Sequence, residues 1–362
     1  MGATLSTSGR ILVPLSAFVL ILGVGTESMA ADFAPRIESA KRSAEVGLGR
    51  SEVTLLERVQ GPGLDETARN LLDSFASSNE VVTTRGRISV RVGDDRVSYV
   101  AEEGWFLDVY NDGSKASYRN YQYLADNPQL AVSVEERLSN EELEMLGREF
   151  IATQLGKFVR MGGGEKLVPS FTEFEITGGG SAIDSKAVER ERVQSAVVVF
   201  SRSVDGVQVI GPGSKVAVVF ANDRSPVGFD FDWPQYKSTA KVQRVLEMEE
   251  LRARLEKDLT LDSSRGDVQV QRVDCGLVDL GARKRDPKSV IQAGCSVQSV
   301  QRSVSEGSKD APNADSGYMT VAVMDYIPVG EYVEPHAYWP STGGSNADDG
   351  TNGPVPKAGP MF

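Results

Sequence analysis

Residues 196–233 read AVVVFSRSVDGVQVIGPGSKVAVVFANDRSPVGFDFDW, and this stretch indicates the fold more directly than any other part of the chain. β-Branched and aromatic residues fill four short runs, and the breaks between them hold Gly, Pro, Asn and Asp, whose backbone preferences suit turns. The predicted strands are Val197–Arg202, Val207–Ile210, Lys215–Phe220 and Val227–Trp233. The pattern therefore predicts an antiparallel sheet of consecutive strands.

A helix followed by an antiparallel meander is expected three times along the chain. Apolar residues recur at helical spacing in Asp65–Phe75, Ser139–Leu155 and Leu246–Leu259. Ser139 and Glu142 have the spacing of a capping box. Strand-like runs follow each helix, namely Arg85–Val92, Arg96–Glu102, Trp105–Tyr110, Lys115–Tyr123, the central four, Val268–Cys275, Cys295–Val304 and Tyr318–Tyr326. Phe33–Leu56 has only a weak helical pattern, which Gly47 and Gly49 interrupt.

These patterns predict an α+β fold made of repeated units, each a helix packed on an antiparallel β-sheet. The expected boundaries are 1–30 for an export signal, 31–135 for an N-terminal unit, 136–240 for a central unit, 241–340 for a C-terminal unit and 341–362 for a tail rich in Gly, Pro, Asn and Asp. Such a tail has little to bury, so we expect it to be disordered.

The first thirty residues have the pattern of a secretory signal. Arg10 precedes the apolar run Ile11–Val24, and Ser28 and Ala30 place small residues before a cleavage position. We expect cleavage near Ala30 and a secreted or periplasmic protein, with an uncleaved N-terminal anchor as the alternative. No later apolar run is long enough to span a bilayer.

Composition is that of an ordinary globular protein, with 40% hydrophobic and 25% charged residues. The formal net charge is −12 at pH 7. Proteins that bind nucleic acids usually carry a basic surface, so we expect no nucleic-acid partner. The two cysteines, Cys275 and Cys295, predict one structural disulfide, because an oxidising compartment favours it and the Cys-x-x-Cys spacing of a redox pair is missing.

The central stretch contains a Gly-Val-x-Val-x-Gly hairpin, formed by Gly206, Val207, Val209 and Gly211, and an apolar strand, Lys215–Phe220, follows it. This arrangement resembles PepSY-like modules and the propeptide modules of fungalysin- and thermolysin-type proteases. The resemblance covers about residues 138–233.

The resemblance implies a small α+β module, with the helix Ser139–Leu155 in the place where such modules keep theirs. It also implies contact with a protease, as a prosegment or as an inhibitor. Precursors of this kind continue into a catalytic domain with a His-Glu-x-x-His helix, which this chain lacks. The module would therefore act without a protease domain of its own.

Few residues suit catalysis. His336 is the one histidine, so a multi-histidine metal site is excluded and a Ser-His-Asp site would depend on this residue. Asp230 and Asp232 share a strand and point to the same face, about 7 Å apart. They are the carboxylate pair that hydrolysis of a glycoside would need, although a half-buried strand with a polar side gives the same pattern. We expect no cofactor and no metal.

An aromatic cluster offers a second kind of site. It consists of Tyr99, Trp105, Phe106, Tyr110, Tyr118, Tyr121 and Tyr123. Such a cluster forms either a platform for a peptide or carbohydrate or, as strand alternation favours, a hydrophobic core with cross-strand pairs.

The preferred function is non-catalytic binding of an extracytoplasmic protein or peptide, for which a protease is one candidate. Binding would use an exposed sheet edge or the central hairpin. The hairpin residues are Gly206, Val207, Val209, Gly211, Pro212 and Gly213. The alternatives are a carboxylate-dependent hydrolase that uses Asp230 and Asp232, and a structural component of the cell envelope.

Overall fold

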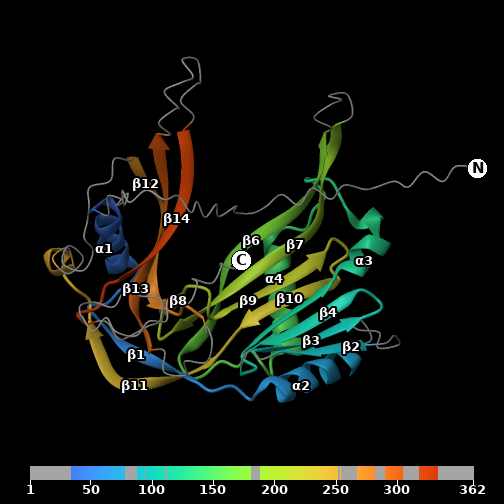
Figure 1. Cartoon of the computed structure of the whole chain (residues 1–362), viewed down its shortest axis with the longest axis horizontal. Coiled ribbons are helices and arrows are strands. Elements are labelled where there is room, and N and C mark those ends of the chain that lie inside the picture. Colours follow the sequence, from blue (N-terminus) through green and yellow to red (C-terminus); the bar gives the residue numbers. More distant parts are fainter. Residues whose placement is uncertain are drawn as a thin grey trace, which may run out of the picture.

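A computed structural model describes residues 34–77, 88–93, 95–110, 112–180, 188–251, 253, 267–281, 290–304 and 318–332 (Figure 1). The predicted signal, His336 and the predicted tail lie outside these residues. The helices are α1 (Ala34–Leu48), α2 (Leu64–Ser77), α3 (Tyr121–Asp126), α4 (Asn140–Phe150), the 3-10 turn η1 (Pro128–Leu130) and the π-helical turn η2 (Ile151–Leu155).

The strands that the structure describes belong to one fourteen-stranded sheet. They are β1 (Glu52–Val59), β2 (Ile88–Val92), β3 (Arg96–Ala101), β4 (Trp105–Tyr110), β5 (Lys115–Asn120), β6 (Glu165–Gly180), β7 (Val188–Val204), β8 (Val207–Ile210), β9 (Lys215–Ala221), β10 (Pro226–Asp232), β11 (Gln235–Arg244), β12 (Asp267–Val278), β13 (Val290–Val304) and β14 (Tyr318–Pro328).

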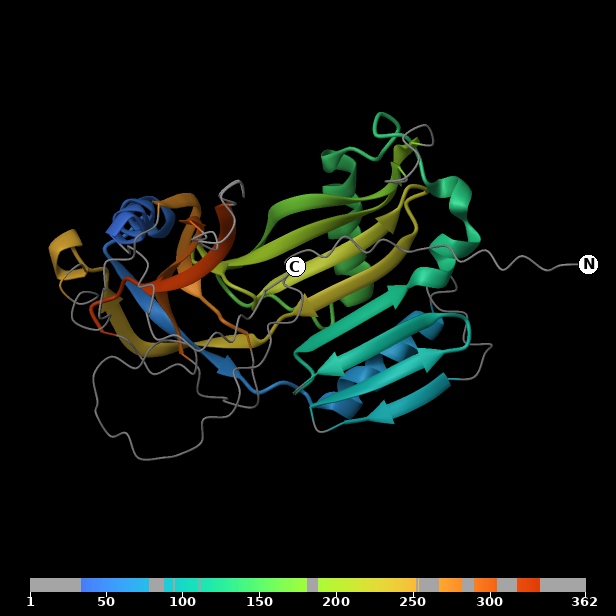
Figure 2. The same ribbon diagram turned by 45° about the horizontal axis from the view of Figure 1, so that its top comes forward.

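Eight of these strands form an antiparallel region that we call the large sheet. Its order is β6, β7, β9, β10, β5, β4, β3 and β2. Helices α2 and α4 lie on the same face of this region (Figure 2). Ala68 and Leu71 of α2 and Leu143 of α4 belong to one buried cluster with Phe229 and other residues of the strands. The two helices therefore share a single hydrophobic core.

The remaining strands form a second region, the small sheet, in which the two ends of the described chain meet. β1 pairs with β11 and β13, and β13 also pairs with β12 and β14. Helix α1 packs on β12 and β13, and its Ala40 and Ala44 are fully buried in a second cluster. β8 connects the two regions, because it is antiparallel to β7 and parallel to β12.

The prediction of repeated helix-on-sheet units is wrong. Phe229 of β10 pairs with Tyr118 of β5, so the strands expected in separate units continue one sheet. The small sheet is covered by α1, from the other end of the described chain, in addition to the beginning of the predicted Leu246–Leu259 helix: residues 248–251 and 253 are helical, and Leu251 is fully buried in the same cluster as Ala40. The fold is a sheet-dominated α+β structure, because the β-branched runs pair across the expected boundaries.

The weak helical pattern of Phe33–Leu56 divides into helix α1 and the beginning of strand β1. Gly47, which interrupted the pattern, lies where α1 touches β12. A Cβ atom at this position would be 2.7 Å from the carbonyl oxygen of Cys275. The glycine thus permits close packing between the helix and the strand.

Two local predictions are confirmed. Cys275 and Cys295 are direct neighbours on β12 and β13 and form a disulfide. Ser139 Oγ accepts a hydrogen bond from the Glu142 amide at 3.2 Å, and Glu142 Oε2 accepts one from the Ser139 amide at 3.1 Å. Helix α4 therefore begins with the expected capping box. Among the described helices, none combines the length and the apolar character needed to cross a membrane.

Candidate functional site

The face of the large sheet opposite α2 and α4 carries the candidate site, and we call it the open face. Of the described helices, only α3 lies at its border (Figure 2). Because side chains alternate between the faces of a strand, register identifies which residues share it. One cross-strand row on the open face runs through Glu173, Val197, Val219, Gly228, Arg119, Phe106, Val100 and Ser89. The next row runs through Phe171, Val199, Ala217, Asp230, Ser117, Asp108, Ser98 and Arg91.

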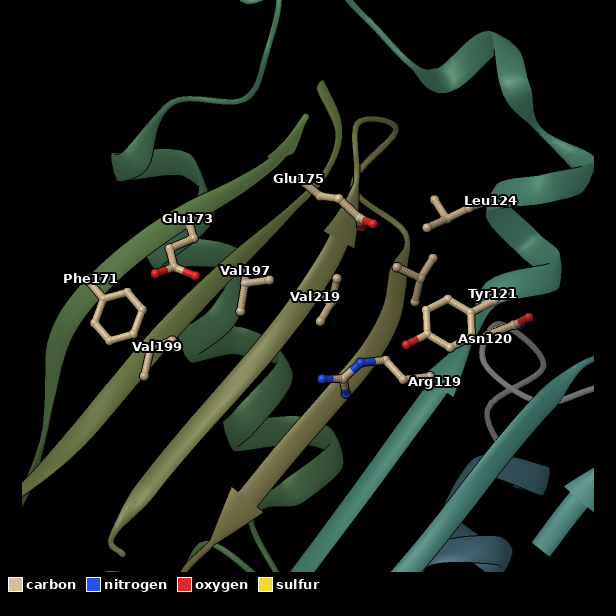
Figure 3. Close-up of a pocket in the computed structure, with 11 residues that line it drawn as sticks. Arg119, Asn120, Tyr121, Leu124, Phe171, Glu173, Glu175, Val197, Val199 and Val219 are labelled. Atoms are coloured by element: carbon tan, nitrogen blue, oxygen red, sulfur yellow. The ribbon is translucent and has the colours of Figure 1, made fainter. Parts of the chain in front are cut away.

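A hollow of about 160 Å³ lies on this face, and we call it the main hollow (Figure 3). Its floor is apolar, with Val197, Val199 and Val219 from neighbouring strands. Its walls are formed by Phe171, Tyr121, Leu124 and Val227 and by polar residues, namely Arg119, Asn120, Glu173 and Glu175. The hollow thus combines an apolar floor with charged groups on two sides.

Arg119 is held rigidly at one side of the main hollow. Its Nη1 donates hydrogen bonds to the carbonyl oxygens of Tyr118 at 2.8 Å and Phe229 at 3.0 Å, and its Nη2 is paired with Asp230. Gly228 makes this placement possible, because a Cβ atom there would be 2.8 Å from Arg119 Cδ. The guanidinium charge is therefore compensated within the protein.

Glu173 and Glu175 point toward the hollow from the opposite side (Figure 3). Both side chains are exposed. Glu175 Oε2 accepts a hydrogen bond from Ser195 Oγ at 2.7 Å, whereas no cation of the described residues is within ion-pairing distance of Glu173. Both residues belong to β6, whose described pairing is with β7, so it is an edge strand of the sheet.

A second hollow lies on the open face over β2, β3 and β4. Arg91, Arg96, Phe106 and Asp108 are among its lining residues. Phe106 separates it from the main hollow and lies 6.0 Å, ring centre to ring centre, from Tyr121. The open face therefore offers two neighbouring depressions that an aromatic pair divides.

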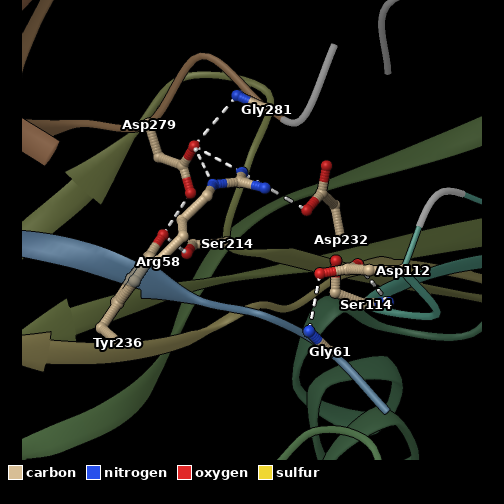
Figure 4. A network of polar contacts seen from close by, with 9 residues as sticks. All are labelled: Arg58, Gly61, Asp112, Ser114, Ser214, Asp232, Tyr236, Asp279 and Gly281. Carbon is tan, nitrogen blue, oxygen red and sulfur yellow. Dashed lines mark hydrogen bonds and ion pairs between the residues drawn. The ribbon is translucent and has the colours of Figure 1, made fainter. Parts of the chain in front are cut away.

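A buried network of charges joins the large and small sheets (Figure 4). Arg58 of β1 donates hydrogen bonds to Asp279 Oδ1 from Nε at 3.2 Å and from Nη2 at 2.5 Å. Arg58 Nη2 also lies 3.6 Å from Asp232 Oδ1. The Tyr236 hydroxyl donates to Asp279 and contacts Ser214 Oγ. These groups come from three strands and two loops, so the network ties the two cores together.

The two carboxylates of this network have pKa values shifted in opposite directions. Burial raises the pKa of Asp232 to about 6, and the charge of Asp279 adds to the effect, whereas Arg58 and Lys115 partly offset it. Burial also opposes ionisation of Asp279, but Arg58, the Tyr236 hydroxyl and the Gly281 amide outweigh burial and lower its pKa. Asp279 therefore holds the arginine, while Asp232 accepts no hydrogen bond at Oδ1 from the described residues.

The structure does not bring Asp230 and Asp232 together as a pair. They share the open side of β10, as strand alternation predicted, but Asp230 is paired with Arg119 and Asp232 with Arg58. Each carboxylate thus has its own arginine. Asp232 lines neither of the two hollows.

The residues of the central hairpin lie between the two sheets. Val207 and Val209 are buried in the core of the small sheet. Gly211 and Gly213 pack against Asp279. A Cβ atom at Gly211 would be 2.4 Å from the carbonyl oxygen of Asp279, and a Cβ atom at Gly213 would be 2.4 Å from its carboxyl carbon. Gly206 and Pro212 are exposed. The hairpin is thus built into the junction of the two sheets.

The aromatic cluster divides between the two faces. Trp105 and Tyr118 are buried in the core beneath α2 and α4, and Tyr118 stacks on Phe229 with ring centres 5.5 Å apart. Phe106 and Tyr121 lie on the open face beside the hollows. Within the described part of the chain, no group of three or more His, Cys, Asp and Glu side chains is placed to hold a metal ion.

Comparisons with known proteins add little to this geometry. No family model matches the chain, and no curated protein matches it. A solved structure of an uncharacterized protein from Eubacterium rectale is similar, with a TM-score of 0.49 and 11% sequence identity over 80% of this chain and 88% of that one. A likeness at this level carries no statement about function.

Proposed function

We propose that this protein is an exported, non-catalytic binding protein that holds an extended segment of another polypeptide on its open face. The main hollow carries this proposal, because it sets buried valines beside charged groups near the β6 edge of an eight-strand surface. Val199 and Val219 are 2% and 6% exposed. A ligand side chain that fills the hollow would complete an apolar cluster on the second face of the sheet.

The size of the main hollow favours a side chain of a polypeptide over a compact small molecule; the second hollow is larger, at about 400 Å³. Pockets for drug-sized ligands usually enclose about 300–1,000 Å³, whereas the main hollow holds about 160 Å³. That space suits a single apolar side chain. The second hollow lies a few strands further along the same face, so a ligand that reaches both must be extended.

The placement of the carboxylates argues for binding and against hydrolysis. A general acid and its partner must both reach the bond that breaks. Asp230 is engaged by Arg119, and Asp232 is 9% exposed and lies outside the hollows. The resemblance of residues 138–233 to propeptide modules supports a protease as one class of partner.

The test uses the chain from Ala31 onward and a library of fluorescent twelve-residue peptides. Fluorescence anisotropy gives the Kd of each peptide for the wild type and for Val197→Asp, which places a charge on the floor of the main hollow. The control is Met145→Asp, because Met145 is 62% exposed on α4, on the other side of the sheet. Circular dichroism checks that both variants fold.

We expect a subset of peptides to bind the wild type and Met145→Asp equally, and Val197→Asp to bind them at least tenfold more weakly, because a buried carboxylate cannot accept an apolar side chain. The proposal is wrong if no peptide binds the wild type. It is also wrong if Val197→Asp binds like the control.

A further inference from the structure

The main hollow has an acidic side that nothing in the described protein neutralises. Glu173 and Glu175 both point toward it from β6, and their described contacts include no cation. The charge of Arg119 on the other side is already matched by Asp230. A ligand in the main hollow therefore meets a negative field, although one of the lining residues is an arginine.

We infer that Glu173 and Glu175 make the open face selective for a lysine or arginine side chain, placed two residues from the apolar side chain that fills the main hollow. This inference rests on the proposed function and names the chemistry of its ligand. The occupant is thus a segment of another polypeptide with the pattern apolar-x-Lys/Arg. Charge complementarity and spacing both support it.

The spacing follows from sheet geometry. Val197 and Val219 face each other across β7 and β9, and Glu173 is the partner of Val197 on β6. Neighbouring strands lie about 4.8 Å apart, so the carboxylate side of the hollow is about 7 Å from a side chain seated between the two valines. In an extended chain, residues two apart on the same face are also separated by about 7 Å. A chain that crosses the strands therefore places its second side chain over β6.

The fixed position of Arg119 explains why an acidic ligand is not favoured on the other side. Its guanidinium donates to two backbone carbonyls and to Asp230, and Gly228 leaves the space in which it lies. A ligand carboxylate that approached this guanidinium would also be repelled by Asp230. The formal net charge of −12 also attracts basic segments over longer distances and raises their association rate.

The experiment starts from the tightest apolar peptide of the library and varies only the position two residues from its apolar anchor. Three versions carry Lys, Gln or Glu there. Kd values are measured by anisotropy at low and at high salt, for the wild type, Glu173→Gln and Glu173→Lys. The control Glu149→Lys changes the net charge by the same amount as Glu173→Lys, at an exposed glutamate of α4 on the other side of the sheet.

We expect the wild type and Glu149→Lys to bind the Lys peptide about tenfold more tightly than the Glu peptide, with a preference that salt weakens. Glu173→Gln should reduce this preference, and Glu173→Lys should reverse it, which a merely structural role for Glu173 would not produce. Equal binding of the three peptides by the wild type, or an unchanged preference in Glu173→Lys, overturns the inference and leaves the proposed function standing. Failure of every peptide to bind overturns both.

Discussion

Substitution of Asp232 by Asn should change how the stability of the protein depends on pH. Asp232 is 9% exposed and its pKa is raised to about 6 from an ordinary value of 3.8. The folded state thus holds this proton more tightly than the unfolded state. The resulting stabilisation is complete below about pH 3 and is lost as the pH rises through 6. Because a tenfold difference in proton affinity corresponds to about 1.36 kcal/mol, the group alone lowers the free energy of unfolding by about 3 kcal/mol between pH 3 and pH 7, of which about 2 kcal/mol falls above pH 4.

The groups that face Asp232 determine this effect. Arg58 and Lys115 favour its ionised form, whereas Asp279 and Asp112 oppose it. The lowered pKa of Asp279 acts in the opposite sense, because its stabilisation is present above pH 4 and is lost only as the pH falls further. The two carboxylates therefore influence different pH ranges, and the range from 4 to 7 reports on Asp232.

The assay is urea unfolding, followed by fluorescence, of the wild type and Asp232→Asn at intervals from pH 4 to pH 7.5. The free energy of unfolding of the variant minus that of the wild type should rise by about 2 kcal/mol over this range, because Asp232 titrates within it whereas its neighbour Asp279 titrates below it. Ser114→Ala is the matched control. It removes a buried hydroxyl of the same junction that has no hydrogen-bond partner among the described residues, so its difference should be flat with pH.

A flat difference for Asp232→Asn would refute this reasoning. It would mean that Arg58, at 3.6 Å, offsets the burial of the carboxylate completely and that Asp232 titrates near its ordinary pKa. A difference that falls with pH would mean that the ion pair outweighs burial.

Three further predictions concern stability. Replacing Cys275 and Cys295 by Ser should lower the free energy of unfolding by about 3 kcal/mol, and reduction of the wild type with dithiothreitol should give the same loss. Gly47→Ala should lower the Tm by several degrees, since the new Cβ atom would lie 2.7 Å from a backbone oxygen. The control Gly163→Ala should leave the Tm unchanged, because no atom lies within 4 Å of a Cβ atom at that position. Equal Tm values for the two variants would contradict this packing. Ser139→Ala should cost about 1 kcal/mol in urea unfolding through loss of the helix cap, and an unchanged midpoint would argue against the capping box.

Local structure could be predicted from the sequence where short-range chemistry decides it. The four strands of residues 196–233 and the capping box of α4 follow from turn residues and spacing in the chain itself. The arrangement of the strands could not be predicted in this way, because pairings such as Phe229 with Tyr118 depend on segments far apart. Strand β11, in which half of the residues are exposed, gives no apolar alternation at all.

The same distinction applies to the candidate site. Strand alternation predicted that Asp230 and Asp232 share a face, but it could not name Arg119 and Arg58 as their partners. Nor could it show which face of the large sheet the helices cover. The grouping of Glu173 with Val197 and Val219 depends on register across three strands, so the main hollow has no signal in any single stretch.

The pairing of early and late strands in the small sheet imposes an order on folding. Strands and helices of the large sheet come from one continuous segment between Leu64 and Asp232 and connect mostly by short turns, so they can assemble early. Helix α1 and strand β1 are synthesised before the large sheet, but β1 can pair only after later strands have been synthesised. Its Glu57 pairs with Lys237 of β11 and its Leu56 with Ile291 of β13. Closing such long loops is slow. Until they close, the apolar face of α1 is exposed and can form non-native contacts. The last step of folding thus brings Arg58 to Asp279, and the junction of the two sheets exists in final form only after the chain has been synthesised past β13.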